Sequence, residues 1–149
     1  MNDRPDLALE AQADGVHLGQ DDAPPALARR ILGPAGLIGL STHALAELEG
    51  AAFEPIDYPS AGPLEPTPTK PGRAGTGIGY VSAAVRRAAR PVFVTGGVRP
   101  ERVPELVAAG VRHFVVVRYL TEAADPEAAA RRMRKVIDEQ IERTASDDP

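Results

Sequence analysis

The chain has 149 residues, 43% of them hydrophobic and 26% charged, a composition typical of one soluble globular domain. Its net charge of −4 argues against nonspecific binding to nucleic acid, and the absence of cysteine excludes disulfide bonds and thiolate sites. No apolar run reaches the roughly 20 residues that a transmembrane helix needs, and no signal peptide opens the chain. We therefore expect a cytoplasmic protein without membrane or nucleic-acid partners.

Predicted helices alternate with short apolar runs along the chain. Strands are expected over residues 16–18, 37–40, 53–58, 92–95 and 114–117. Helices are expected over residues 5–13, 25–32, 44–49, 80–89, 102–109 and 126–143. Asp3 or Arg4 is the expected N-cap of the first helix, and aspartate is the better cap. Residues 1–143 would then form one domain, and residues 144–149 a disordered polar tail.

This alternation of strands and helices predicts the α/β class with a parallel sheet. Polar residues or glycines follow each strand. In a (β/α)₈ TIM barrel, the positions after all strands lie together on the rim that forms the active site. In a doubly wound sheet, only the loops at one topological switch point bind the ligand. The barrel therefore explains more of the sequence. Since five strands are visible and Asn2–Asp3 look like the end of another, we expect an incomplete barrel of about five βα units.

Two segments on the expected rim suit an anion. Thr67, Thr69 and Lys70 place two hydroxyls and an ammonium within four residues of a proline-rich loop, which suits a phosphate or pyrophosphate; a plain surface turn is the alternative. Gly96–Gly97 follow a strand and would let backbone N–H groups approach an anion, although a tight turn would also need them.

Asp3 and Asp22 are the carboxylates expected to act together. Each follows a strand position on neighbouring loops, so both could reach one Mg²⁺, which prefers oxygen ligands; alternatively, each caps a helix. Among the histidines, His43 on the rim is the better candidate for substrate contact. His17, between apolar neighbours in a strand, is interpreted mainly as a core residue, and His113 as structural.

Several motifs together resemble the thiamine-phosphate synthase family. They are Asn2-Asp3, Asp14-Gly15-Val16-His17-Leu18-Gly19-Gln20-Asp21-Asp22, Ser41-Thr42-His43, Gly62-Pro63 followed by Thr67-Pro68-Thr69-Lys70, and Thr95-Gly96-Gly97. The matches follow one another in the family's order over nearly the whole chain. The resemblance implies a TIM barrel that joins hydroxymethylpyrimidine diphosphate to thiazole phosphate and releases pyrophosphate with the help of Mg²⁺.

The resemblance also implies residue roles. Asp3 and Asp22 would hold Mg²⁺. Asn2, Ser41 and Lys70 would bind the pyrimidine diphosphate, with Ser41 and Lys70 as the catalytic residues. Thr67, Thr69 and Gly97 would bind the thiazole phosphate, and Val117 and Arg118 at the end of the last strand would also bind substrate. The family usually has a serine at the position of Arg118, and an arginine can bind a phosphate bidentately.

The family also has a Gln-x-Arg-x-Lys segment on its N-terminal strands, which this sequence does not contain. On that ground we expect the chain as given to lack appreciable synthase activity. Unpaired strand edges would favour a homo-oligomer or a complementing chain. The alternative function is that of a non-catalytic half-barrel that binds a phosphorylated small molecule or pairs with a second chain.

Overall fold

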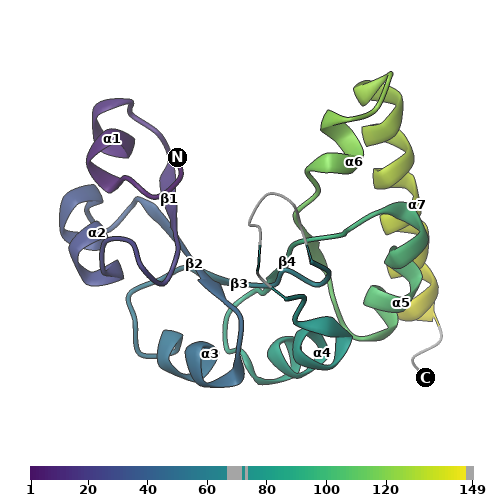
Figure 1. Cartoon of the computed structure of the whole chain (residues 1–149), viewed down its shortest axis with the longest axis horizontal. Helices are drawn as coiled ribbons and strands as arrows, with labels where there is room; N and C mark the ends of the chain where they lie inside the picture. The colour runs from purple at the N-terminus through teal and green to yellow at the C-terminus, as the bar shows by residue number, and fades with distance from the viewer. Residues whose placement is uncertain (67–71, 73, 147–149) are drawn as a thin grey trace.

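The computed structural model describes residues 1–66, 72 and 74–146 and contains a parallel five-stranded sheet in the sequential order β1-β2-β3-β4-β5. The strands are β1 (Gly15–Leu18), β2 (Leu37–Thr42), β3 (Tyr58–Ala61), β4 (Phe93–Val94) and β5 (His113–Phe114). Figure 1 shows an open arc in which the strands line the inner side and the helices cover the outer side. This arrangement confirms the predicted α/β class.

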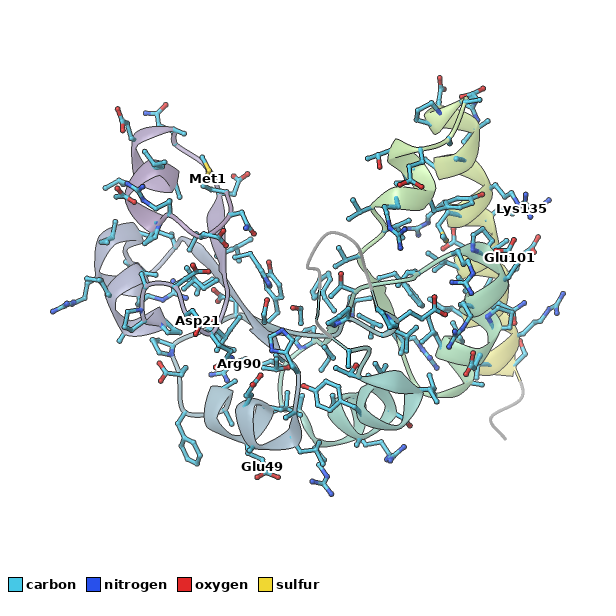
Figure 2. All side chains as sticks on the ribbon, viewed as in Figure 1. Met1, Asp21, Glu49, Arg90, Glu101 and Lys135 are labelled. Atoms are coloured by element: carbon cyan, nitrogen blue, oxygen red, sulfur yellow. The ribbon has the colours of Figure 1, made fainter. Side chains whose placement is uncertain are left out.

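The helices follow the strands in the predicted alternation. They are α1 (Pro5–Glu10), α2 (Pro25–Leu32), α3 (Leu45–Ala51), α4 (Gly77–Arg87), the 3₁₀ helix η1 (Pro100–Arg102), α5 (Val103–Ala108), α6 (Arg118–Thr121) and α7 (Pro126–Ser146). The short α6 was not predicted. Figure 2 shows Glu49, Glu101 and Lys135 on the outer side of the arc. Within the described residues, no helix combines the length and apolar character needed to cross a membrane.

Several of the predicted boundaries are wrong, including that of the first helix, which ends at Glu10 rather than at residue 13. The third strand begins at Tyr58 rather than at residue 53, and Phe53 is 92% exposed. The last strand covers His113–Phe114 rather than residues 114–117 because its partner β4 has two paired residues. The last helix continues to Ser146, so residues 144–146 are helical and do not belong to a tail, while residues 147–149 lie outside the described residues.

The N-terminal residues lie beside β1. Asn2 forms a parallel bridge with His17, the Asp3 N–H donates to the His17 carbonyl at 2.9 Å, and the His17 N–H donates to the Met1 carbonyl at 3.0 Å. This pairing agrees with the end of a strand. Arg4, not Asp3, occupies the N-cap position of α1, and neither caps the helix through its side chain. Asp3 instead has a φ of 63°, a conformation uncommon for a residue with a side chain.

The apolar core lies between the sheet and the helices, in two clusters. The first includes Val16, Leu18, Ile38 and Leu40, whose side chains pack with those of α1 and α2. The second includes Val94 and gathers residues of α4, α5 and α7. Burying a side chain such as Leu18 or Ile38 stabilises the fold by about 1.5–3 kcal/mol. Because strand side chains alternate, residues such as His17, Ser41 and Tyr58 face the inner side of the arc.

Two polar contacts fix helices to strands. The Arg29 guanidinium of α2 donates to the carbonyl of Gly36 at 2.5 Å and to Asp57 Oδ2 at 2.8 Å, and the same oxygen accepts the Ile38 N–H at 2.7 Å. At the opposite end of β2, the buried Thr42 Oγ1 donates to the Ser60 carbonyl at 2.9 Å and accepts the Tyr80 hydroxyl proton at 2.7 Å. These contacts hold both ends of β2, on which part of the site is built.

Candidate functional site

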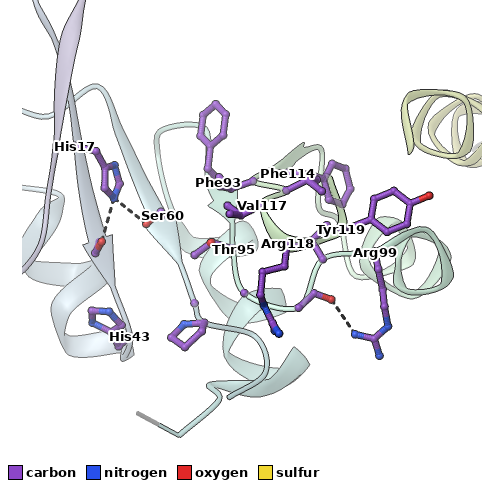
Figure 3. Close-up of a pocket in the computed structure, with 18 of the residues that line it drawn as sticks. His17, His43, Ser60, Phe93, Thr95, Arg99, Phe114, Val117, Arg118 and Tyr119 are labelled. Carbon is purple, nitrogen blue, oxygen red and sulfur yellow. Dashed lines mark hydrogen bonds between the residues drawn. The ribbon is translucent and has the colours of Figure 1, made fainter. Parts of the chain in front are cut away.

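An open cavity of about 870 Å³ lies on the inner side of the sheet, toward the carboxyl ends of the strands. Its lining comes from all five strands or from the segments that follow them. Figure 3 shows His17, His43 and Ser60 on one side of this cavity, and Arg99, Arg118 and Tyr119 on the other. In parallel α/β folds, this end of the strands is where ligands bind.

A polar cluster around His17 forms one wall of the cavity. The His17 Nε2 atom lies 3.0 Å from Ser41 Oγ and 3.4 Å from Ser60 Oγ, and its Nδ1 atom lies 3.2 Å from the Tyr58 hydroxyl. Figure 3 marks two hydrogen bonds of the His17 ring as dashed lines, one of them to Ser60. Burial, together with the nearby Asp57 carboxylate, raises the pKa of Tyr58, so this phenol stays protonated at neutral pH. The cluster therefore presents fixed hydrogen-bonding groups to the cavity.

Gly39 makes this cluster possible. His17, Gly39 and Tyr58 are paired across β1, β2 and β3, so the two rings meet over a residue without a side chain. A Cβ atom on Gly39 would lie 2.4 Å from His17 Nδ1 and 2.3 Å from Tyr58 Cζ, closer than van der Waals contact permits. The rings continue along the sheet, since Phe93 lies 4.8 Å from Tyr58 and 4.9 Å from His113, between centroids. They give the wall an apolar, aromatic base.

The opposite wall contains the turn that follows β4. Gly96 and Gly97 have φ values of 83° and 81°, which favour glycine. Among the residues that the structure describes, none accepts a hydrogen bond from the N–H group of either glycine. Arg99 and Arg118 line the same part of the cavity. N–H groups without a partner among the described residues, in the same lining as the Arg118 side chain, are suited to an anion.

The structure brings together the described residues that were predicted to bind substrate. They are Asn2, Ser41, Gly97, Val117 and Arg118, and all five line the large cavity. Thr67, Thr69 and Lys70 lie outside the described residues. His43 also lines the cavity, and its Nδ1 atom lies 2.9 Å from Glu47 Oε2.

The two predicted metal ligands lie apart from this cavity's lining. Asp22 lines a smaller hollow with Gly19 and Gln20, and its Oδ2 atom accepts the Gly19 N–H at 2.7 Å. Asp3 is exposed, and its Oδ1 atom accepts the Asn2 amide at 2.6 Å. Within the described residues, the second oxygen of each carboxylate has no hydrogen-bond partner, and no group of three or more acidic or histidine side chains is arranged to hold a metal ion.

His17, interpreted from the sequence mainly as a core residue, lines the cavity, as do Tyr58 and Ser60, which were not predicted as site residues. The sequence feature that could have identified these residues is the alternation of side chains between the two faces of each strand. Val16 and Leu18 are apolar and face the helices, so the intervening His17 had to face the other side of the sheet. The same period places Tyr58 and Ser60 together on the inner side of β3.

Comparisons with known proteins agree with this arrangement. The family model described as thiamine monophosphate synthase matches residues 1–120. A thiamine-phosphate synthase from Mycobacterium sp. (strain KMS) is 51% identical over 138 residues, which are 92% of this chain and 61% of that protein. A structure of thiamine phosphate pyrophosphorylase from Pyrococcus furiosus superposes with a TM-score of 0.85 at 31% identity, covering 94% of this chain and 67% of that one.

More distant structures share the fold alone. A 3-hexulose-6-phosphate synthase from Salmonella typhimurium superposes with a TM-score of 0.68 at 18% identity, over 91% of this chain and 67% of that one. These likenesses identify the five βα units as part of a TIM-barrel arrangement. The chain spans about three fifths of the length of the curated relatives that it matches, 61% for the Mycobacterium protein. Over that span, the chain belongs to the thiamine monophosphate synthase family.

Proposed function

We propose that this chain carries the substrate-binding site of a thiamine-phosphate synthase, while the low turnover expected of the 149 residues alone stays a prediction. In the proposed reaction, the C–O bond between the pyrimidine methylene group and the diphosphate of hydroxymethylpyrimidine diphosphate breaks. The thiazole nitrogen of thiazole phosphate forms a C–N bond to the same carbon, and pyrophosphate leaves. The observation that carries the proposal is that Asn2, Ser41, Gly97, Val117 and Arg118, identified from the sequence, line one cavity.

The two walls of the cavity suit the two substrates. Asn2 and Ser41 belong to the wall with His17, whose contact with Ser41 Oγ would orient that hydroxyl toward the pyrimidine substrate. Gly97, Val117 and Arg118 belong to the other wall, where the glycine N–H groups and the guanidinium would receive the phosphate of the thiazole. By their motif positions, Thr67 and Thr69 would also bind this phosphate.

Catalysis in this proposal is mainly stabilisation of the departing diphosphate. Lys70 would place an ammonium against the charge that develops as the C–O bond breaks. Asp3 and Asp22 would hold Mg²⁺, which would supply further positive charge. We place the reaction in the cytoplasm, with small molecules as its substrates. Assembly into a homo-oligomer or with a complementing chain stays a prediction.

The test measures binding and turnover separately. Calorimetry on the purified 149-residue chain should detect thiazole phosphate, and pyrophosphate in the presence of Mg²⁺. Lys70→Ala should weaken pyrophosphate binding by about 1.5–3 kcal/mol, as expected for a hydrogen bond to a charged group. Lys135→Ala on the outer helix α7, where the side chain is 76% exposed, is the matched control.

A second assay supplies both substrates with Mg²⁺ and measures thiamine phosphate. Ser41→Ala should lower product formation, while Ser146→Ala at the end of α7 should leave it unchanged. If the chain neither binds the ligands nor forms product, the proposal is rejected. Binding without product would assign ligand recognition, and not catalysis, to these 149 residues.

A further inference from the structure

An ionic cluster joins the segment after β3 to the segment after β4. Glu65 Oε2 lies 2.8 Å from Arg99 Nη1, and Glu65 Oε1 accepts a hydrogen bond from Arg102 Nη1. The Glu65 side chain is 32% exposed and that of Arg102 is 23% exposed, so the cluster is partly shielded from solvent. Because each oxygen of the Glu65 carboxylate contacts a different guanidinium group, these ion pairs fix the orientation of the carboxylate as well as attract it.

This cluster lies directly against the Gly96–Gly97 turn. A Cβ atom on Gly97 would be 2.7 Å from Glu65 Oε2, so the carboxylate fits there because residue 97 has no side chain. Backbone bonds run beside it, from the Leu64 N–H to the Thr95 carbonyl at 2.8 Å and from the Glu65 N–H to the Gly96 carbonyl at 3.3 Å. Arg99 Nη1, which contacts Glu65 Oε2, also donates to the Gly97 carbonyl at 3.1 Å and so links the carboxylate to the turn.

The charges of the cluster balance. Arg102 Nε lies 2.8 Å from Glu105 Oε2, although not in hydrogen-bonding geometry. Two carboxylates, Glu65 and Glu105, therefore face two guanidinium groups, Arg99 and Arg102. Without that balance, a carboxylate beside an anion-binding turn would repel the anion. With it, Glu65 can touch the turn and leave the site open to a phosphate.

We propose that Glu65 is a positioning residue for phosphate binding: it fixes the Gly96–Gly97 turn in the conformation that presents its N–H groups to the phosphate of the thiazole substrate. The inference rests on the proposed function, because that function names the ligand. Glu65 itself does not touch the phosphate. It acts through Arg99, Arg102 and the backbone of the turn.

The direction in which Glu65→Gln changes the affinity for thiazole phosphate distinguishes a positioning role from a purely electrostatic one. Glu65→Gln removes a negative charge near the anion, so a purely electrostatic role predicts tighter binding of thiazole phosphate. A positioning role predicts the opposite, and we expect the dissociation constant to rise about three- to ten-fold, the effect of losing one such contact. Glu105→Gln is the matched control, because it removes the same charge from a residue that does not contact the turn. Binding to this control should be unchanged or slightly tighter.

A second variant and a second ligand test whether weaker binding results from misfolding of the chain. Glu65→Asp keeps the charge but shortens the side chain, so it should also weaken binding, while calorimetry with pyrophosphate and Mg²⁺ should give the wild-type affinity for all variants. If the wild-type chain binds thiazole phosphate and Glu65→Gln binds it equally well or better, the positioning role is overturned and the proposed function stands. If the wild-type chain does not bind thiazole phosphate, the positioning role is overturned, and the proposed function falls with it only if pyrophosphate with Mg²⁺ is not bound and no thiamine phosphate forms.

Discussion

Replacing Gly39 with alanine should destabilise the fold and break the polar wall of the cavity. The added Cβ would lie 2.3 Å from Tyr58 Cζ and 2.4 Å from His17 Nδ1, so the strands or rings must move. Overpacking of this kind costs about 1–3 kcal/mol, and loss of the His17–Tyr58 hydrogen bond adds about 0.5–1.5 kcal/mol. Alanine also restricts the unfolded chain, which returns about 0.4–1 kcal/mol. The net loss should be about 0.5–4 kcal/mol, with a central value of about 2 kcal/mol.

Urea denaturation measures this change. With a slope of about 1–3 kcal/mol per molar for a small protein, the midpoint should fall by roughly 1 M. The matched control is Gly50→Ala in α3, where nothing lies within 4 Å of the added atom. Because glycine is a poor helix former, this control should raise stability by up to about 1 kcal/mol. If Gly39→Ala is as stable as the wild-type chain, the close approach of His17 and Tyr58 does not require a glycine, and the reasoning is refuted.

Two further predictions concern polar groups at the ends of strands. Thr42→Val should cost about 1–3 kcal/mol, because it leaves the Tyr80 hydroxyl and the Ser60 carbonyl without their buried partner; urea denaturation giving a loss below about 0.5 kcal/mol would contradict it. The hydrogen bond from Arg99, opposed by burial and aided by Arg102, lowers the pKa of Glu65 below its ordinary 4.5. The contribution of Glu65 to stability should therefore be complete above about pH 5 and disappear as the pH falls through the lowered pKa, so thermal unfolding of Glu65→Gln should lack this component of the acid sensitivity.

The sequence was sufficient for the class of fold because each apolar run marks a strand that is covered by helices. The predicted strand boundaries were wrong where the local sequence looks extended but the residues do not pair with a neighbouring strand. Residues 53–58 look extended, yet Phe53 is 92% exposed and pairing with β2 starts opposite Gly39, at Tyr58. Likewise, Val117 follows an apolar run, but the chain has already left the sheet and enters α6.

The site was partly predictable because parallel strands bring their carboxyl ends together. That rule was enough to propose Gly97, whereas Ser41 was proposed from the family resemblance, and both line the cavity. It could not reveal the contacts that position them. The cluster at His17 depends on the absence of a side chain at Gly39, and the link at Glu65 depends on two arginines more than 30 residues away, 34 and 37 positions along the chain. Such pairings become visible when the backbone brings the residues together.

The sequential strand order has a consequence for how the chain acquires its structure. Each strand pairs with its predecessor in the sequence, so contacts in the sheet span one βα unit and do not require the whole chain to close on itself. Contacts of short sequence separation cost less chain entropy and form faster. The cluster around Leu18 and Ile38 can therefore assemble before the cluster around Val94 and Leu106 is complete. We expect the two clusters to behave as separate cooperative units in amide hydrogen exchange, with β3 as the element that couples them.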